Sequence, residues 1–353
     1  MTTPDPDKLN AFLGKLVGDL GASTSAALVL LGDRLGIYKA MADGKATTPD
    51  DLATRIGLNA RYLREWLSAQ AAAGYVDYNP KSRKFKLNPE QVAAFADEGG
   101  HAFFAGAFEV AQAMWLDEGK VAEAFKTGKG VGWHEHSACL FRGTERFFRP
   151  GYNAHLVSHW IPALKGVEDK LTKGGVVADV GCGHGASTIL MALAFPKSRF
   201  FGFDYHAPSI ARAKQQAKDA GVGKRVTFEQ ASAKDYPANK YDLVTFFDCL
   251  HDMGDPVGAG KHTREALASD GTWMIVEPFA HDDLKHNLNP VGRVYYAAST
   301  MICTPASLSQ EVGLGLGAQA GEARLKQVVK DAGFGKFRRA AETPFNMVFE
   351  ARA

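Results

Sequence analysis

The sequence predicts an α/β protein: a doubly wound parallel sheet that closes with an antiparallel hairpin, preceded by a mainly helical domain with a winged helix. Three observations support this fold class. Two capped helices and a short hairpin follow one another between residues 45 and 90. From residue 175 onward strands and helices alternate, which is typical of parallel sheets. After the last helix the chain ends in two extended runs, which favour a hairpin.

The chain has 353 residues, and a prior of roughly 150 residues per domain predicts more than one domain. We expect a winged-helix or dimerisation domain over 1–95. A helical connector covering the active site should follow over 96–172. The sheet domain should occupy 173–353, with a substrate-covering insertion over 279–322.

Composition limits the class of partner. The net charge of +2 gives no field that would attract nucleic acid or a membrane surface. The N-terminus lacks the pattern of a signal peptide, and the apolar stretch around 102–115 is too short to cross a bilayer. The four cysteines are far apart and form no CxxC, which is typical of reduced thiols in the cytoplasm.

The first elements are helical. Residues from about Leu9 to Asp43 form a long apolar helical region. Thr48 is then expected to cap one helix, with Pro49 at its first position, and Asn59 to cap a second that closes at Gly74. Two short strands around the Asn-Pro-Lys-Ser turn complete a winged helix.

The winged helix raises the question of DNA binding. Residues 45–90 hold eight Lys or Arg and five Asp or Glu, a net charge of +3, and four of the positive charges lie at the wing tip, KSRKFK. A basic wing is one signal of DNA binding. Against it, the second helix has few side chains suited to reading bases, since Glu65 offsets Arg61 and Arg64 and an Ala-rich half follows. Dimerisation is the preferred role, and nucleic acid is not expected as a partner.

The sheet elements of the second half follow in order. The expected strands are VVADV, RFFGFD, RVTFEQA, YDLVTFF, TWMIVEP, KFRRAAET and NMVFEAR. The expected helices are ASTILMALAF, PSIARAKQQAKDAG, GAGKHTREALA and EARLKQVVKDAGF. In such sheets, ligands bind outside the carboxyl ends of the strands.

A glycine turn follows the first of these strands. VVADVGCGHGAST contains Asp179, Gly181, Gly183 and Gly185 between a strand and a helix, the context that gives such motifs meaning. Glycines let the backbone pass close to a ligand. Asp204 ends the next strand, where a carboxylate suits two ribose hydroxyls. The turn fits either a dinucleotide GxGxxA pattern or an acid-x-Gly-x-Gly-x-Gly pattern. Asp179 would repel a pyrophosphate but suit an ammonium group, which favours the second and makes a nicotinamide dehydrogenase the weaker alternative.

With this motif, about 147–352 resembles the class I S-adenosylmethionine-dependent methyltransferases, whose sheet is Rossmann-like. The resemblance implies S-adenosyl-L-methionine as cofactor. It places Asp179 and the three glycines beside the methionine part and Asp204 on the ribose. Ser232 and Ala233 would then lie beside the adenine, although many members carry an acid at the position of Ser232. Phe247 and Asp248 would border the sulfonium.

The segment FFDCLHDMGDP, after the strand YDLVTFF, is similar to that of plant-type small-molecule O-methyltransferases. The resemblance implies that His251 deprotonates the acceptor hydroxyl and that Glu277, in MIVEP, flanks it. Glu322 is only a loose counterpart of a second flanking acid, and Met253 stands where the plant-type aromatic follows. The alternative is that His251 only contacts substrate or caps a helix.

The WHEHSAC segment and the insertion hold further residues with a possible role in a metal site or a pocket. His134, His136 and Cys139 in WHEHSAC lack a standard zinc spacing, so no metal is expected and a pocket-lining or helix-start role is preferred. In the insertion, Arg293, Tyr295, Tyr296 and Met301 are candidate pocket residues, and plain packing is an equal alternative for each.

Together these patterns predict an S-adenosylmethionine-dependent methyltransferase that methylates an oxygen of a small, largely apolar molecule, with His251 as general base. The likeness over nearly the whole chain is to an actinobacterial, mycobacterial-type family that joins a winged helix to this domain. A homodimer through the N-terminal domain is expected. The alternative function is a DNA-binding regulator whose second domain senses a ligand.

Overall fold

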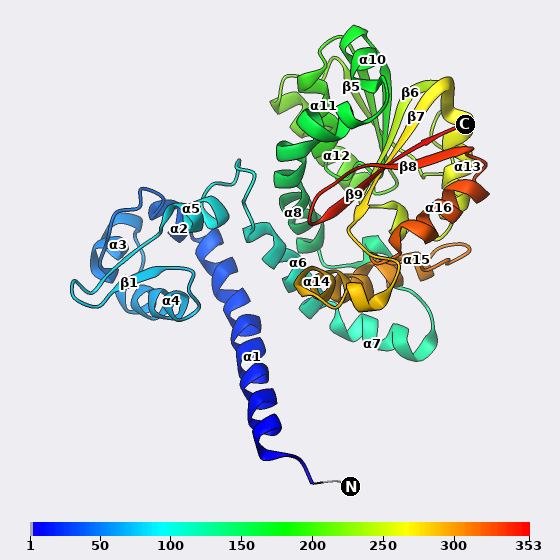
Figure 1. Ribbon diagram of the computed structural model, residues 1–353. Helices are drawn as coiled ribbons and strands as arrows, with labels where there is room; N and C mark the ends of the chain where they lie inside the picture. The colour runs from blue at the N-terminus through cyan, green and yellow to red at the C-terminus, as the bar shows by residue number, and fades with distance from the viewer. Residues whose placement is uncertain (1–2) are drawn as a thin grey trace. The chain divides into compact units, whose positions relative to one another are not determined.

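The computed structural model describes residues 3–353, which fold into two compact units (Figure 1). Unit 1 comprises Met1–Gln112 with Arg142–Pro150, and unit 2 comprises Ala113–Phe141 with Gly151–Ala353. Parts of the segment 96–172 fall in each of the two units.

Unit 1 contains the predicted winged helix. Its elements are α1 (Pro6–Arg34), α2 (Ile37–Ala40), α3 (Pro49–Ile56), α4 (Ala60–Ala72), β1 (Asp77–Asn79), β2 (Lys84–Lys86), α5 (Pro89–Phe95) and most of α6 (Ala105–Leu116). Thr48 caps α3, since its Oγ1 accepts from the Asp51 amide at 3.1 Å, and the Asn59 side chain caps α4. β1 and β2 pair antiparallel as the wing, and Leu52, Leu63 and Trp66 form the core beneath it.

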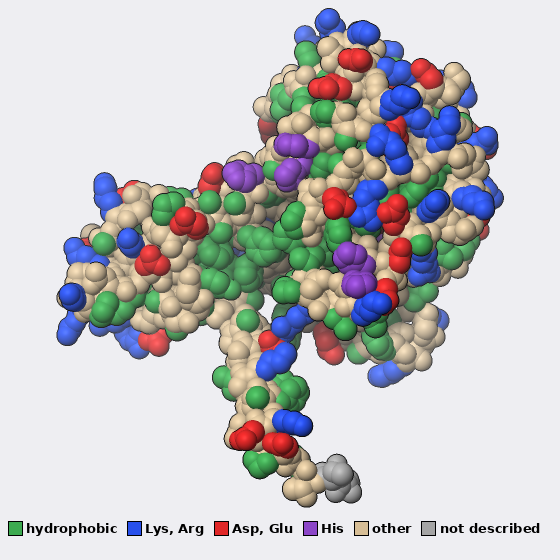
Figure 2. Space-filling view, viewed as in Figure 1, with side chains coloured by type: hydrophobic (Ala, Val, Ile, Leu, Met, Phe, Trp, Pro, Cys, Tyr) green, Lys and Arg blue, Asp and Glu red, His purple; other side chains and the backbone are tan. Residues whose placement is uncertain are grey.

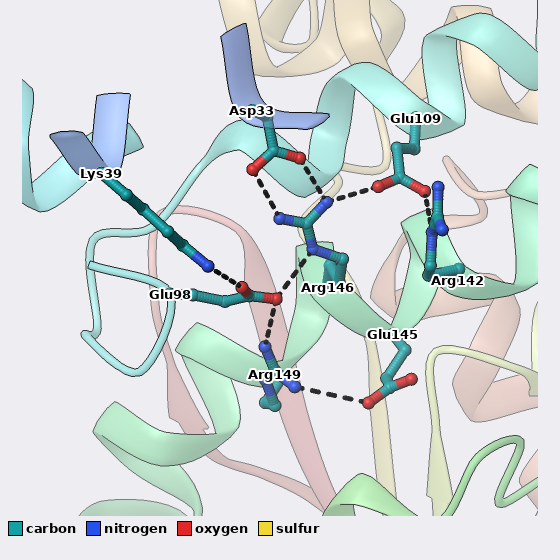
Figure 3. Close-up of polar contacts among 8 residues, drawn as sticks. All are labelled: Asp33, Lys39, Glu98, Glu109, Arg142, Glu145, Arg146 and Arg149. Carbon is teal, nitrogen blue, oxygen red and sulfur yellow. Dashed lines mark hydrogen bonds and ion pairs between the residues drawn. The ribbon is translucent and has the colours of Figure 1, made fainter. Parts of the chain in front are cut away.

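A charge cluster centred on the buried Arg146 joins Arg142–Pro150 to the rest of unit 1 (Figure 3). Arg146 of α8 (Cys139–His155) donates to both oxygens of Asp33, at 2.7 and 3.0 Å, and to Glu98 at 3.0 Å. It also donates to Glu109, which accepts from Arg142 at 2.6 Å. Arg146 thereby holds three carboxylates from three separate segments, which explains why this part of α8 belongs with the N-terminal elements.

Unit 2 is built on the predicted sheet. Its strands are β3 (Val176–Val180), β4 (Arg199–Asp204), β5 (Val226–Gln230), β6 (Tyr241–Phe247), β7 (Leu267–Pro278), β8 (Lys336–Glu342) and β9 (Asn346–Arg352). Their order is β5-β4-β3-β6-β7-β9-β8, and only the pairs formed by β9 are antiparallel. The fold class predicted from the sequence is confirmed, including the hairpin at the end.

Helices follow the strands as expected. The crossover helices are α11 (Ala186–Ala194), α12 (Ala207–Asp219), α13 (Pro256–Ala266) and α16 (Gly321–Asp331). Before the sheet lie α7 (Glu118–Thr127), η1 (Trp133–Glu135), η2 (Leu156–Trp160), α9 (Ile161–Ala163) and α10 (Val167–Lys173). η3 (Leu250–Asp252) follows β6, and the insertion contains η4 (Leu284–His286), α14 (Pro290–Ala298), η5 (Ser299–Cys303) and α15 (Thr304–Leu308). The reversal of strand order between β3 and β6 opens the place where such sheets bind ligands.

Candidate active site

The glycine turn lies between β3 and α11, at the reversal of strand order. Gly181, Gly183 and Gly185 all have positive φ, at 75°, 52° and 82°, which side chains with a Cβ rarely adopt. The amides of Gly181 and Cys182 donate to the Phe203 carbonyl at 2.8 and 3.0 Å and fix the turn against β4. A Cβ on Gly183 would meet no atom within 4 Å, so this glycine borders open space.

Two aspartates hold the turn from either side. Asp179 is buried and accepts from the hydroxyls of Ser187, Thr188 and Thr245 at 2.6–3.1 Å. Burial raises the pKa of Asp179 to about 6, although those hydroxyls lower it. Asp204 accepts from the amides of His206 at 2.8 Å and Gly183 at 3.0 Å. The acids that the sequence singled out thus shape the turn.

Asp248 occupies the junction between β6 and η3. Its φ is 50°, an uncommon conformation that a non-glycine residue keeps only where the surroundings enforce it. Tyr152 donates to its Oδ2 at 3.2 Å, and Asn346 donates to its Oδ1 at 2.8 Å. Burial, reinforced by the charge of Glu277, raises the pKa of Asp248 well above its usual range. Phe247 packs beside it with its ring 5.3 Å from that of Tyr152.

His251 and Glu277 form a buried pair. Glu277 ends β7, and its Oε2 lies 2.5 Å from Nδ1 of His251 while its Oε1 accepts from the Leu250 amide at 3.0 Å. Both side chains are less than 5% exposed. The carboxylate of Glu277 therefore fixes the orientation of the His251 ring through Nδ1, and Nε2 is the nitrogen that Glu277 does not contact.

Other groups surround Nε2 of His251. Oδ1 of Asp252 lies 3.2 Å from it, and Cys303, at the end of η5, completes a group of three donor atoms within 4.8 Å of one another. Burial opposes protonation of His251, but the charges of Glu277 and Asp252 raise its pKa well above the usual value. Burial raises the pKa of the Cys303 thiol to about 12. The Cys303 thiol therefore stays protonated, and the neighbouring carboxylates favour proton uptake by His251.

The insertion clamps the segment that follows His251. The Ser307 hydroxyl donates to the Met253 carbonyl at 2.8 Å. The Gln310 side chain donates to the Asp252 carbonyl at 2.9 Å and accepts from the Gly254 amide at 3.1 Å. η5 is a π-helical turn, a feature frequent at functional sites.

The remaining residues singled out from the sequence are dispersed. Ser232 and Ala233 lie half-buried in the loop after β5. Glu322 accepts from Arg339 at 2.9 Å, so its side chain is engaged at α16 and β8. In the insertion, Tyr295 is buried and donates to the Phe345 carbonyl at 2.8 Å. Tyr296 and Met301 are half-buried, and Arg293 is exposed.

The WHEHSAC segment contributes one buried ring. His134 is exposed, whereas His136 is buried with Nδ1 3.1 Å from Oδ2 of Asp117. Sequence reasoning missed Asp117, Tyr152, Asn346 and Cys303 as neighbours of the site. They lie between 19 and 98 positions from the residues they contact, and no local pattern marks them.

Comparison with known proteins identifies both parts of the chain. Residues 171–333 match the methyltransferase domain family, and residues 23–96 match the Rv2258c-like winged helix-turn-helix domain family. The chain therefore carries a methyltransferase domain preceded by a winged helix-turn-helix domain of that type.

Curated relatives match parts of the chain. Trans-aconitate 2-methyltransferase of Streptomyces avermitilis is 31% identical over 113 residues, 32% of this chain and 42% of the relative. The 27-O-demethylrifamycin SV methyltransferase of Amycolatopsis mediterranei is 29% identical over 154 residues, 41% of this chain and 48% of the relative. The matches thus span less than half the length of each of these relatives.

Solved structures share the fold over the whole chain. Human N-acetylserotonin methyltransferase, solved with S-adenosylmethionine, has a TM-score of 0.71 at 14% identity and covers 100% of this chain and 99% of its own. An O-methyltransferase family protein from Burkholderia thailandensis has a TM-score of 0.70 at 15% identity, covering 97% and 98%. The fold is that of S-adenosylmethionine-dependent O-methyltransferases, which supports the expected cofactor. The open space at Gly183 and the acid at Asp204 fit such a molecule.

Proposed function

We propose that the protein is a methyltransferase that transfers a methyl group from S-adenosylmethionine to an oxygen of a small, largely apolar molecule. The observation that carries the proposal is the buried His251–Glu277 pair, placed at the carboxyl ends of β6 and β7. These strands run parallel to β3, so their carboxyl ends lie at the same edge of the sheet as the glycine turn, where such sheets bind ligands.

The cofactor would lie along the glycine turn. Asp179 and the three glycines would adjoin its methionine part, with Asp204 on the ribose. Ser232 and Ala233 would adjoin the adenine, and Phe247 and Asp248 the sulfonium side. When bound, S-adenosylmethionine supplies an electrophilic methyl group. Gly183 contributes by leaving open the space that a side chain would fill.

His251 would act as general base. A phenol with a pKa of about 10 is roughly 0.1% ionised at pH 7, so removal of its proton assists attack. Nε2 of His251 takes that proton while Glu277 holds Nδ1 and stabilises the imidazolium. General base catalysis of this kind contributes roughly 10²–10⁴-fold in rate. Tyr295 and Cys303 would line the acceptor side.

Two measurements test this function. Calorimetry should detect binding of S-adenosylmethionine and not of NAD. Methyl transfer from labelled S-adenosylmethionine to a panel of phenols should then fall at least about 100-fold in His251→Ala, while His101→Ala, at an exposed position of unit 1, keeps the wild-type rate. Absence of S-adenosylmethionine binding at millimolar concentration refutes the function, and a loss below about tenfold in His251→Ala refutes the base.

A regulator that binds DNA is the second candidate, because Lys81, Arg83, Lys84 and Lys86 make the wing basic. On α4, however, Arg61 pairs with Glu65 at 2.5 Å and Arg64 with Asp50 at 3.5 Å. We expect no retention on duplex DNA. Retention that falls steeply with salt would favour the regulator.

We further propose that the protein is a cytoplasmic homodimer that pairs through α1. Hydrophobic side chains lie exposed along this helix (Figure 2). They recur three and four positions apart: Leu9, Phe12, Leu13, Leu16, Val17 and Leu20. By length and composition alone α1 would also span a membrane, with a mean hydropathy of 1.2. Asp7, Lys8, Lys15 and Asp19 within its first half favour a protein partner over a bilayer.

A further inference from the structure

A second histidine–carboxylate pair lies in unit 2, apart from His251 and Glu277. Asp117 follows α6, and its Oδ2 lies 3.1 Å from Nδ1 of His136. The Ser137 amide and hydroxyl both donate to the same carboxylate at 2.8 Å, and Lys120 donates at 2.9 Å. The side chains of His136 and Asp117 are each 1% exposed. The ring of His136 is therefore held in one orientation.

The partners of Asp117 determine which nitrogen of His136 carries the proton. Burial alone would raise the pKa of Asp117, but the hydrogen bonds from Ser137, Lys120 and His136 lower it to about 2, so the carboxylate is ionised. Burial lowers the pKa of His136 against the effect of Asp117. A neutral ring beside an ionised carboxylate carries its hydrogen on Nδ1 and donates it there. Nε2 consequently presents a lone pair.

Nε2 of His136 is a buried nitrogen without a hydrogen-bond partner among the described residues. Buried polar atoms in this state are rare, because losing water without gaining a partner is unfavourable. Since Asp117 binds the opposite edge of the ring, Nε2 faces away from it. The Oδ1 atom of Asp252, 3.2 Å from Nε2 of His251, likewise makes no hydrogen bond.

These two atoms belong to one region of unit 2. The Val131 amide, on the segment that leads to His136, donates to the Pro305 carbonyl at 3.0 Å. Pro305 lies two residues after Cys303, whose thiol clusters with the side chains of His251 and Asp252. The charge of Asp252 also acts on His136. The loop around 130–136 thus approaches the His251 cluster from the side of η5 and α15.

We propose that Nε2 of His136 accepts a hydrogen bond from a hydroxyl group of the methyl acceptor other than the oxygen that faces His251. Asp117 is the positioning residue that fixes the ring and its tautomer. The acceptor class is then a small molecule that carries a second hydroxyl group besides the one that faces His251. This inference rests on the proposed function and narrows its substrate class.

The specificity follows from the lone pair. A hydroxyl group can donate a hydrogen bond to Nε2 of His136. A methoxy group or a hydrogen atom at the same position of the ligand leaves Nε2 without a hydrogen-bond partner. Sites built for a hydrogen bond discriminate strongly against ligands that lack it. We expect the matching diol to bind about 10- to 100-fold more tightly than its monohydroxy and monomethoxy analogues.

Binding to the full-length protein saturated with S-adenosylhomocysteine tests the inference. The probes are the dihydroxynaphthalene isomers, the two naphthols and the corresponding hydroxy-methoxynaphthalenes. At least one diol should show the stated preference. His136→Phe should reduce the preference ratio to near one, and His136→Gln, which keeps an acceptor oxygen, should retain part of it. His101→Phe, at an exposed histidine of unit 1, is the control and should keep the full ratio.

A second readout tests the tautomer directly. In protein with ¹⁵N-labelled histidine, the His136 signal should show hydrogen on Nδ1, and Asp117→Asn should mix the two tautomers. Hydrogen on Nε2 in the wild type, an unchanged ratio in His136→Phe, or no preference for any diol overturns the inference. If S-adenosylmethionine does not bind at all, the proposed function itself fails. If S-adenosylmethionine binds normally but no diol is preferred, only the inference about His136 fails.

Discussion

His251 is held between two carboxylates that come from different elements. Glu277 of β7 contacts Nδ1, Asp252 of η3 lies 3.2 Å from Nε2, and Cys303 of η5 completes the immediate surroundings, with Asp248 also buried nearby. Burial alone would lower the pKa of His251, but the two carboxylates raise it well above the usual value. The two carboxylates therefore favour the protonated form of the ring.

This arrangement predicts a rate that rises with pH. A base acts only when deprotonated, so kcat/KM should increase as pH rises through the elevated pKa of His251. Glu277→Gln removes a charge that favours the imidazolium, so the rising limb should move to lower pH. The plateau should fall, because the imidazolium formed during transfer loses its partner. Glu65→Gln on α4 is the exposed control. If the rising limb of the pH–rate profile lies at the same pH in Glu277→Gln as in the wild type, the assignment of His251 as base is contradicted.

Gly183 provides a test of the cofactor site with a matched control. Gly183 and Gly221 both have positive φ, at 52° and 72°, and at both a Cβ would meet nothing within 4 Å. An alanine at either position should cost about 1 kcal/mol of stability, because the backbone conformation disfavours a Cβ. Only Gly183→Ala should also weaken S-adenosylmethionine binding, by at least tenfold, since its methyl group enters the proposed site. Equal affinity in both variants, measured by calorimetry, would place the cofactor elsewhere.

At this scale the sequence predicts residues that lie within recognisable local motifs. The glycine turn and the His251 segment follow buried strands, so their placement could be predicted from strand ends. The closeness of Glu277 to His251 came from the resemblance. Asp117 and Cys303 could not be predicted. Their roles depend on loop paths, and a single sequence contains no signal for contacts between distant loops.

At the scale of elements, helix caps and the alternation of strands and helices predicted most of the secondary structure. Thr48, Asn59 and the alternation after residue 175 located the winged helix and the sheet. The division of α8 between the two units was not predictable. It depends on Arg146, whose three carboxylate partners lie 37 to 113 positions away in sequence.

Arg146 should therefore be essential to the stability of unit 1. Its replacement by alanine leaves the buried carboxylates of Asp33 and Glu109 without the positive charge of Arg146. Removing one partner of such a buried ion pair lowers the free energy of unfolding by about 3–5 kcal/mol. Arg61→Ala, which breaks the exposed pair with Glu65, should cost less than about 1 kcal/mol. Urea unfolding followed by circular dichroism measures both. Equal midpoints for the two variants would contradict the role of Arg146.

A second set of variants distinguishes the loss of the Arg146 charge from the loss of its side-chain packing. Arg146→Met removes the charge but keeps much of the packing of the arginine stem, and it should also be destabilised if unpaired carboxylates cause the loss. Adding Asp33→Asn and Glu109→Gln to Arg146→Met should then recover part of that loss, because neutral side chains tolerate burial better than charges. Further destabilisation in the triple variant would instead indicate that packing of the arginine stem dominates.

At the scale of the whole molecule, the exposed face of α1 requires an explanation. Single exposed apolar side chains are ordinary, but a continuous stripe over several turns of one helix marks an interaction surface. Isologous pairing would place the same stripe of two copies face to face. The charges at Lys8, Lys15 and Asp19 lie outside the stripe in sequence spacing and would stay in water.

The dimer can be tested without disturbing the site. Leu13→Glu with Val17→Glu introduces two charges at positions that are 47% and 71% exposed within one chain, so the chain itself should keep its stability. In a dimer both charges would be buried against the partner, which is strongly unfavourable. Light scattering should give twice 38.0 kDa for the wild type and 38.0 kDa for the double variant. Tyr62→Glu, at an 80% exposed position of α4, should remain dimeric. A monomeric wild type that floats with liposomes would show instead that α1 binds membranes, and a double variant that stays dimeric would move the interface away from this helix.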